Sequence, residues 1–427
     1  MNILIICDAF PPDTIIGGIR PFMFAKYLLK FGHKVTVLKS GIIWAKEDSG
    51  FEGQLEGMRI ITVLPPPAVS LQSSDNQRKK RIPQWLKVLY FALYEPVNIL
   101  KEYKIFNKLY KQQKRVIDGM NSEHYDVVFS TFSPVADIYA GEYASKVFGC
   151  KWIMDFRDAL IQPNSRSWLW NRFFLKTQIQ AVEKSDACTT VSNGVRHMLS
   201  IGAKEANIVT LYNGYDTTDG DLETTKQNCL TLCYTGGIYG MRMEALTFIL
   251  QAIALLQNKK EISLDNVRFE YAGLKTNELM DQMKKFGLES ILNSHGYLSV
   301  SECEALQRNS DLFLVLSWNT QKEQGILTGK FFEGVRSAKP MLVSVVGDAP
   351  NSELAELNEE YHYGFCYESF SEKPMMDQMC KYIKEKYNEK MKKGMISYNQ
   401  DPRLSEKFNY EHLSRELESL CYNLLKQ

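Results

Sequence analysis

The chain has 427 residues, which favours two or three domains. Its 51 basic and 50 acidic side chains leave a net charge of +1, which gives no reason to expect a nucleic-acid partner. Nine cysteines without a CxxC pair argue against a disulfide framework and favour buried thiols in a reducing compartment. No run approaches the roughly 20 apolar residues of a transmembrane helix, and the short apolar start lacks the features of a signal peptide. We therefore expect a cytoplasmic protein.

The first half of the chain alternates short apolar runs with segments of helical periodicity. Asn2–Cys7 is continuously apolar, as in a strand buried on both faces, and a helical segment follows over Pro21–Phe31. Strands that alternate with helices pair in parallel, because each crossover must pass over a face of the sheet. The other strands expected in this half are Lys34–Lys39, Met58–Leu64, Asp126–Ser130, Lys151–Asp155, Ala187–Val191 and Asn207–Leu211.

A polar stretch with Asn-Gly and Asp-Gly turn signals, Tyr212–Asn228, separates this half from a second series. That series has a helix at Glu244–Leu256, and an amphipathic helix at about Tyr410–Lys426 ends the chain. Its expected strands are Leu230–Tyr234, Phe269–Ala272, Leu312–Leu316 and Met341–Val346. We predict an α/β protein of two Rossmann-like domains, 1–212 and 229–405, joined by a linker at 213–228. The C-terminal helix, 406–427, is expected to pack back on the N-terminal domain.

One segment breaks the alternation. Pro65–Lys80 is rich in Pro and Ser and is expected to be a mobile loop. The basic cluster Arg78–Arg81 follows, and then an aromatic helical stretch that includes Trp85 and Tyr94, with further lysines up to Lys114. A basic cluster beside an aromatic helix fits an anionic membrane surface, here through 78–115, on the inner face of the cell membrane. A core helix with a solvated face is the alternative.

Two motifs of the first half come where ligands bind in open α/β sheets, after the carboxyl ends of strands. The loop FPPDTIIGGIR carries Gly17 and Gly18, which let the backbone approach an anionic ligand at a helix N-terminus, or simply make a tight turn. Its lack of a GxGxxG pattern weakens a dehydrogenase interpretation. In the second motif, DFRD, Arg157 and Asp158 are candidates to contact an acceptor hydroxyl or a developing charge. A structural ion pair is the alternative.

The second half repeats the strand, glycine loop and helix arrangement in YTGGIYGMR. Gly236 and Gly237 free backbone N–H groups for a diphosphate, and Arg242 one turn later can neutralise it. The alternative is a simple turn between a strand and a helix.

A second motif of this half is GILTGKFFEGVRSAKP, in which a helix is expected to begin at Thr328. Lys330 and Glu333 are three residues apart and therefore share a helix face. The lysine suits a phosphate and the carboxylate suits two vicinal ribose hydroxyls. The alternative is a surface ion pair.

Together these motifs resemble the retaining GT-B glycosyltransferases of family 4, which build bacterial polysaccharides and glycolipids. The resemblance covers nearly the whole chain and implies an active site in the cleft between two domains. It also implies a UDP- or GDP-sugar donor, a glycan or lipid-linked acceptor, and no metal or other cofactor. The order and spacing of the motifs carry it: FPPDTIIGGIR, KYLLKFGHKVTVL, VSNGV, YNGYD, YTGGIYGMR, HGYLS and TGKFFEGVRSAKPML.

The resemblance also implies a role for each matched residue. Arg242 and Lys330 would grip the donor phosphates, Glu333 would bind the ribose, and Thr328 would lie in the same donor site. Arg157 falls where many relatives carry a histidine near the reacting sugar, with Asp158 beside it. The matched backbone positions are Gly236 and Gly237 at the diphosphate, Gly296 and Tyr297 at the base, and Gly17 and Gly18 at the phosphate and acceptor.

One departure concerns the position seven residues before the ribose carboxylate. Many relatives carry a second glutamate there, but this chain has Gly325, with Glu323 nearby and out of register. This departure leaves open which group meets the donor sugar. The missing glutamate also suggests an alternative to a transferase, a catalytically silent nucleotide-sugar-binding subunit. A nucleotide-sugar 2-epimerase is a second alternative, because that class of enzyme shares the architecture.

Overall fold

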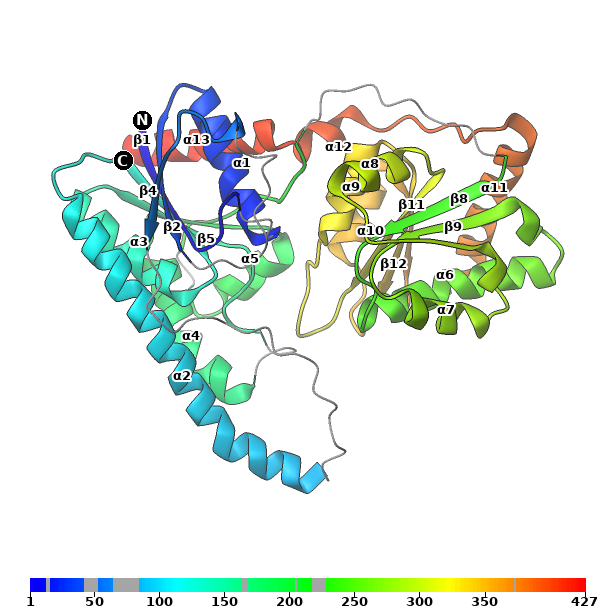
Figure 1. Cartoon of the computed structure of the whole chain (residues 1–427), viewed down its shortest axis with the longest axis horizontal. Coiled ribbons are helices and arrows are strands. Elements are labelled where there is room, and N and C mark those ends of the chain that lie inside the picture. The colour runs from blue at the N-terminus through cyan, green and yellow to red at the C-terminus, as the bar shows by residue number, and fades with distance from the viewer. Residues whose placement is uncertain are drawn as a thin grey trace. The chain divides into compact units, whose positions relative to one another are not determined.

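The computed structural model describes residues 1–12, 16–41, 53–63, 84–162, 167–203, 206–216, 228–371 and 374–427. The chain divides into two compact units, one formed by Met1–Tyr212 with Tyr410–Gln427 and the other by Asn213–Asn409 (Figure 1). The predicted loop Pro65–Lys80 and the basic cluster Arg78–Arg81 lie outside the described residues.

The first unit is built on a parallel sheet of seven strands in the order β3-β2-β1-β4-β5-β6-β7. Along the chain, helices separate the central strands, so the connections between these strands cross the faces of the sheet and bury them. This explains why β1 and β4 are apolar almost throughout. The strands are β1 (Asn2–Cys7), β2 (Lys34–Ser40), β3 (Arg59–Val63), β4 (Val127–Phe132), β5 (Lys151–Phe156), β6 (Ala187–Thr190) and β7 (Ile208–Thr210).

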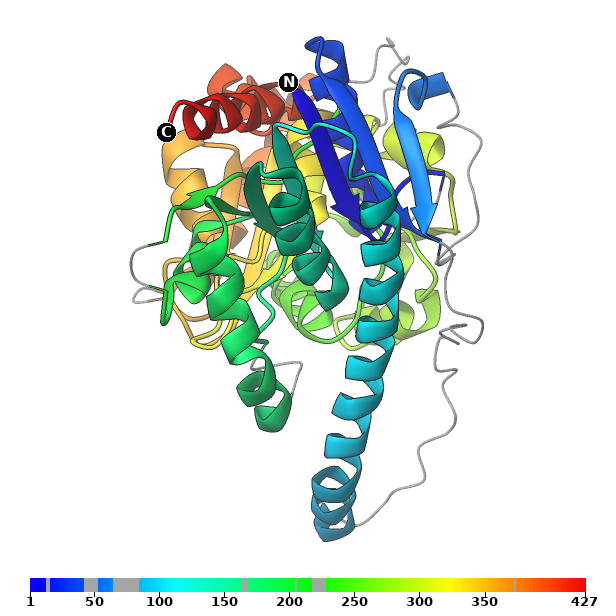
Figure 2. The ribbon, with the colours of Figure 1, turned by 90° about the vertical axis from the view of Figure 1, so that its left-hand side faces the viewer.

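The helices of this unit include the last helix of the chain. That helix, α13, packs against α1 (Figure 2), and its Tyr410 ring meets the Phe24 ring edge to face at 6.0 Å. Its buried residues, among them Leu413, Leu417 and Leu424, recur at helical spacing, so one apolar stripe faces the unit. The helices are α1 (Ile16–Lys30), α2 (Gln84–Gly119), α3 (Val135–Phe148), α4 (Trp168–Lys184), α5 (Asn193–Ser200) and α13 (Tyr410–Leu425).

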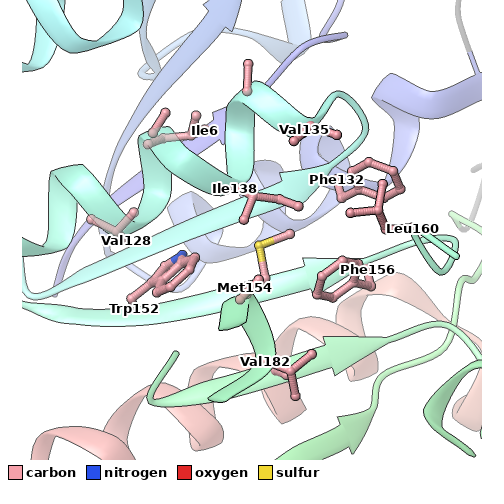
Figure 3. Packing of buried hydrophobic residues seen from close by; sticks show 14 of the residues in the cluster. Ile6, Val128, Phe132, Val135, Ile138, Trp152, Met154, Phe156, Leu160 and Val182 are labelled. Carbon is pink, nitrogen blue, oxygen red and sulfur yellow. The ribbon is translucent and has the colours of Figure 1, made fainter. Parts of the chain in front are cut away.

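The core between this sheet and α3 is closely packed (Figure 3). Trp152 of β5 is buried, and its indole N–H donates to Ser130 Oγ at 2.9 Å. A Cβ atom at Gly141 of α3 would lie 2.2 Å from the same oxygen, so only glycine lets the helix come this near.

The second unit has a parallel sheet of six strands in the order β10-β9-β8-β11-β12-β13. The strand predictions in this half omitted β10 and β13. Both are short edge strands, and β10 (LNSHG) alternates half-buried and exposed residues instead of forming an apolar run. The strands are β8 (Leu230–Thr235), β9 (Val267–Ala272), β10 (Leu292–Gly296), β11 (Leu312–Trp318), β12 (Met341–Val346) and β13 (Gly364–Glu368).

Helices follow most of these strands and begin at the carboxyl edge of the sheet. That edge therefore gathers the loop after β8, the end of β10 and the start of α9, where the predicted donor-binding residues are found. The helices are α6 (Met241–Asn258), α7 (Thr276–Lys284), α8 (Val300–Arg308), α9 (Gly329–Ser337), α10 (Glu353–Tyr361), α11 (Met376–Lys393) and α12 (Pro402–Lys407), with short 3-10 turns at Leu264–Asn266 and Glu289–Ile291.

Candidate functional site

The glycine loop after β8 has a backbone that other residues fit poorly. Gly236 has a φ of +113°, and a Cβ atom there would lie 3.1 Å from Cε of Lys330. The loop after β9 also lies close to Gly236, since a Cβ atom at Gly273 would lie 2.5 Å from the Gly236 carbonyl oxygen. The Lys330 side chain therefore lies over the loop, as expected for a cation that shares a ligand with its N–H groups.

Lys330 and Glu333 share one face of α9, as predicted, and in this structure they pair with each other. The Lys330 ammonium donates to both carboxylate oxygens of Glu333, at 2.5 and 2.6 Å, and to Thr235 Oγ1 at 3.2 Å. Both side chains are only a quarter exposed. The pair therefore belongs to the edge of the β8 loop and differs from a freely solvated surface pair.

A third side chain, Gln307 of α8, completes this cluster and was not predicted from the sequence. Its Nε2 donates to Thr235 Oγ1 at 2.8 Å and to Glu333 Oε2 at 2.7 Å, and the residue is 1% exposed. The signal that could have found it is a glutamine at a buried helical position directly before an apolar strand.

Arg242 is held beside the other glycine of the same loop. Its Nη1 donates to the Gly237 carbonyl oxygen at 3.4 Å, and its guanidinium carbon lies 5.1 Å from the centre of the Tyr239 ring. Burial raises the pKa of the Tyr234 hydroxyl, which stays protonated and donates to the same carbonyl oxygen at 3.4 Å. The structure thus places Arg242 and Lys330 against one loop, Gly236–Gly237.

Helix α9 begins beside these groups with an unusual cap. Thr328 is its N-cap residue, as predicted, but its side chain makes no capping hydrogen bond. Thr328 Oγ1 is buried and, within the described part of the chain, has no hydrogen-bond partner. A buried hydroxyl without a partner costs free energy, and a helix N-terminus favours anions. Both features suit a bound anion at this point.

The remaining predicted residues of this unit lie at the same edge of the sheet. Gly296 ends β10 with a φ of +68°, and Tyr297 is 81% exposed. Gly325 has a φ of +70°, a conformation in which a glutamate would be strained. Glu323 accepts a hydrogen bond from Trp318 Nε1 at 3.1 Å and is anchored by it.

In the first unit, Gly17 and Gly18 lie inside α1, so the expectation that they form a loop before the helix is wrong. The helix already begins at Ile16 and contains Pro21, which has no N–H to give to the carbonyl four residues earlier. The Arg157 guanidinium donates to that carbonyl, Gly17 O, instead. The helix can therefore include Pro21 because a distant side chain supplies the missing donor.

Arg157 makes two further bonds of the same kind. Its Nε donates to the Phe132 carbonyl oxygen at 3.0 Å and its Nη2 to the Ser133 carbonyl oxygen at 3.4 Å. Arg157 thus ties α1 to the end of β4. Asp158 is exposed at the carboxyl end of β5.

The first aspartate of the DFRD motif forms the structural ion pair that was weighed for it. Asp155 is fully buried, and its Oδ1 lies 2.8 Å from Nη2 of Arg20, which is 2% exposed. Thr131 and Thr189 each donate a hydroxyl to the same carboxylate at 2.8 Å. Asp155 therefore holds β4, β5 and β6 to α1.

A second buried acid lies at the start of α3. Burial raises the pKa of Asp137 well above its usual range, and the nearby Asp8 carboxylate raises it further. Gln113 of α2 donates to Asp137 Oδ1 at 2.6 Å, which partly offsets these effects. We assign Asp137 a packing role between α2 and α3.

No group of three or more His, Cys, Asp and Glu side chains in the described ranges has the arrangement of a metal site. No helix of those ranges combines the length and the apolar composition needed to cross a bilayer.

The fold is similar to that of several solved structures that span nearly the whole chain. One is a glycosyltransferase from Rickettsia africae, with 14% identity and a TM-score of 0.58 over 100% of this chain and 99% of that one. Another is HepE from Anabaena in complex with UDP and glucose, with 14% identity and a TM-score of 0.57 over 99% and 100%. The predicted fold class, two Rossmann-like α/β domains, is confirmed.

The same fold also occurs in a different class of enzyme. A putative UDP-N-acetylglucosamine 2-epimerase from Listeria monocytogenes has 10% identity and a TM-score of 0.55 over 100% of this chain and 97% of that one. No protein-family model and no curated protein matches the sequence. Function must therefore be argued from the side chains of the site.

Proposed function

We propose that this protein is a retaining hexosyltransferase of the family 4 type. It would transfer a sugar from a UDP- or GDP-sugar to a glycan or lipid-linked acceptor in cell-surface polysaccharide biosynthesis. The observation that carries the proposal is the arrangement around Gly236–Gly237: two cations, Lys330 and Arg242, lie against this loop. The Thr328 hydroxyl at the start of α9, which has no hydrogen-bond partner among the described residues, is a third group suited to a diphosphate.

The chemistry is substitution at the anomeric carbon. The bond from this carbon to the diphosphate oxygen breaks, a bond to the acceptor oxygen forms, and the acceptor hydroxyl gives up its proton to the departing diphosphate. Negative charge gathers on the departing diphosphate, where Lys330, Arg242 and the α9 N-terminus stabilise it. These groups supply the charge that a metal ion supplies elsewhere, so the proposal includes no metal cofactor.

Donor binding requires Lys330 and Glu333 to exchange partners. In this structure they pair with each other. In the donor complex that we propose, the ammonium binds a phosphate and the carboxylate accepts hydrogen bonds from the two ribose hydroxyls. A phosphate replaces the carboxylate as the anionic partner of Lys330, and two ribose hydroxyls replace the ammonium as hydrogen-bond donors to Glu333. The exchange therefore leaves neither group without a hydrogen-bond partner in a partly buried place. We propose that Gly296 and Tyr297 contact the nucleobase of the donor.

The acceptor side of the site is assigned to the first unit. Gly17 and Gly18, at the start of α1, and Asp158, at the end of β5, lie at the carboxyl edge of its sheet. Asp158 is the candidate to contact the acceptor hydroxyl. Arg157 would act mainly by fixing Gly17, since its guanidinium donates to three backbone carbonyls.

A thermal-shift screen of nucleoside diphosphates and their sugars tests the proposal. UDP or GDP, and one of its sugars, should raise the melting temperature by about 5 °C at roughly 100 times the dissociation constant, because a ligand that binds only the folded state stabilises it by mass action. The corresponding adenine nucleotides are the control. If no uracil or guanine nucleotide stabilises the protein, the proposal is wrong.

Product analysis separates the three possible functions, of which two are enzymatic. An epimerase, the activity named for the Listeria structure, would convert the donor to an isomeric nucleotide-sugar without any acceptor. A transferase would release the free nucleoside diphosphate by slow hydrolysis during long incubation with donor alone. A silent binding subunit, the alternative suggested by Gly325, would leave the donor unchanged. We expect hydrolysis.

We also propose that the protein contacts an anionic membrane surface through residues 78–115. The described part of α2 exposes Tyr94, Val97, Leu100 and Tyr103, all apolar or aromatic, and exposed lysines lie between and after them. In both views this end of α2 extends away from the sheet (Figures 1 and 2). Apolar side chains beside lysines match the interface of an anionic bilayer.

The membrane proposal predicts a loss of vesicle binding. Replacing Tyr94, Leu100 and Tyr103 together by Ser should weaken cosedimentation with phosphatidylglycerol vesicles by roughly tenfold or more, because the apolar area that enters the interface is lost. Replacing Arg78–Arg81 by Ser should weaken it as well. Leu274→Ser, which removes an apolar side chain 81% exposed on the second unit, is the control. Unchanged binding of both the Tyr94, Leu100 and Tyr103 variant and the Arg78–Arg81 variant would exclude this surface.

A further inference from the structure

Gln307 lies behind the Lys330–Glu333 pair, where it touches the carboxylate assigned to the ribose. It is 1% exposed, and its amide nitrogen donates to Glu333 Oε2 at 2.7 Å. We propose that Gln307 is a positioning residue that orients Glu333 and thereby sets the preference of the site for a ribose with free hydroxyls. This inference rests on the proposed function.

The contacts distinguish the two carboxylate oxygens of Glu333. Oε2 accepts hydrogen bonds from Gln307 Nε2, from Lys330 Nζ at 2.6 Å and from Thr235 Oγ1 at 3.4 Å. Among the described residues, Oε1 accepts a hydrogen bond from Lys330 alone, at 2.5 Å. When Lys330 turns to a phosphate, Gln307 and Thr235 still hold Oε2. Oε1 is then the oxygen that faces the ribose hydroxyls.

The orientation of the Gln307 amide is itself fixed by an arginine. Arg336 Nη2 donates to Gln307 Oε1 at 3.2 Å. A guanidinium has donors only, so the amide oxygen must face Arg336 and the amide nitrogen must face Glu333. Arg336 is held in turn by Glu304, whose Oε1 lies 2.6 Å from Nη1 of Arg336. A flipped amide would lose both contacts.

The spacing of these residues shows how two helices build the network. Glu304 and Gln307 are three residues apart on α8, and Glu333 and Arg336 are three residues apart on α9, so each pair shares a helix face. The two helices pack against each other. The charged groups around the amide are Lys330, Glu333, Arg336 and Glu304, and Arg308 also pairs with Glu304, at 3.3 Å. The partly buried network therefore holds three cations and two anions.

The test compares two ligands that differ only in the ribose. The wild-type protein should bind UDP or GDP roughly tenfold more tightly than the matching 2′,3′-dideoxy nucleotide, as expected for hydrogen bonds to a charged group. Gln307→Met keeps the volume but removes the donor, so affinity for the ribonucleotide should fall by roughly tenfold while affinity for the dideoxy nucleotide stays the same. A purely structural role would weaken both ligands equally.

Gln307→Glu adds a second measurement, the pH dependence of the preference for ribose. At neutral pH a second carboxylate would repel Glu333, so the variant should also lose its preference for ribose. As the pH falls, the pair of carboxylates takes up one proton, because two neighbouring carboxylates raise the pKa of one of them. The resulting O–H then replaces the amide donor, and the preference should recover towards pH 5. This recovery decides the question even if Gln307→Met folds poorly.

Gln282→Met is the matched control, since the Gln282 amide also donates to a threonine, Thr247 Oγ1 at 2.6 Å. It should keep the full preference for ribose. If the Gln307 variants keep that preference at every pH, the positioning role is wrong and the proposed function stands. If the wild-type protein binds neither UDP nor GDP, both are overturned.

Discussion

Replacing Arg20 by Met is expected to destabilise the first unit by about 3–5 kcal/mol, the largest loss of stability we predict for one substitution. Arg20 and Asp155 are 2% and 0% exposed, so the change leaves a carboxylate buried without the cation that neutralises it. Arg20 also donates to the Leu211 and Tyr212 carbonyl oxygens, at 2.8 and 2.7 Å, and these bonds are lost too. Urea unfolding followed by circular dichroism measures the change.

An exposed ion pair in the same unit provides the control. Arg59 lies 2.7 Å from Glu123, but its side chain is 56% exposed, so Arg59→Met should cost less than about 1 kcal/mol. Adding Asp155→Leu to Arg20→Met should recover part of the loss, because the uncompensated charge is then removed. Equal effects of Arg20→Met and Arg59→Met would show that the buried pair contributes no more than a surface pair.

The DFRD motif shows where sequence reasoning reached its limit. The motif was predicted to follow a strand of a parallel sheet. It lies at the carboxyl end of β5, which already includes Asp155 and Phe156. The sequence did not show which charges are buried: Asp155 pairs with Arg20, 135 residues earlier, while Asp158 stays exposed. Local pattern predicts an element and the edge of a sheet, but the partner of a charge depends on contacts between distant segments.

The start of α1 illustrates the same limit for backbone structure. Pro21 predicted a helix that begins at the proline, because proline fits the first turn and breaks a helix interior. The helix starts five residues earlier, at Ile16, because Arg157 donates to the carbonyl that Pro21 leaves without a donor. A side chain 140 residues away therefore decides where this helix begins.

The geometry of the residues that we propose to bind the donor was easier to predict because their spacing is local. Lys330 and Glu333 lie on one turn of a helix, and Gly236, Gly237 and Arg242 lie in one strand-to-helix connection, so short motifs carry their geometry. Gln307 belongs to no motif, and its role follows only from the packing of α8 on α9. The edge strand β10 was missed for a related reason, since half-polar residues beside solvent give no apolar run.

Replacing Lys330 by Met is expected to lower the rate of donor hydrolysis, as kcat/KM, by roughly 100-fold or more. The ammonium lies over the Gly236–Gly237 loop, where the proposal places the diphosphate, and removing one group that stabilises a developing negative charge has an effect of about this size. Affinity for the intact nucleotide-sugar should fall less, by about 1–2 kcal/mol, because the oxygen that links the diphosphate to the sugar carries less charge before the bond breaks. Calorimetry and hydrolysis assays measure the two quantities separately.

Lys275→Met is the matched control for this substitution. Lys275 and Glu278 form the same kind of pair, three residues apart at 2.9 Å and in the same unit, but both side chains are about half exposed. Its removal should change neither quantity, since a solvated pair contributes little. If Lys330→Met binds the nucleotide-sugar as tightly as Lys275→Met does, Lys330 does not contact the phosphates. The charge on the leaving group must then be met by Arg242 and the α9 N-terminus alone.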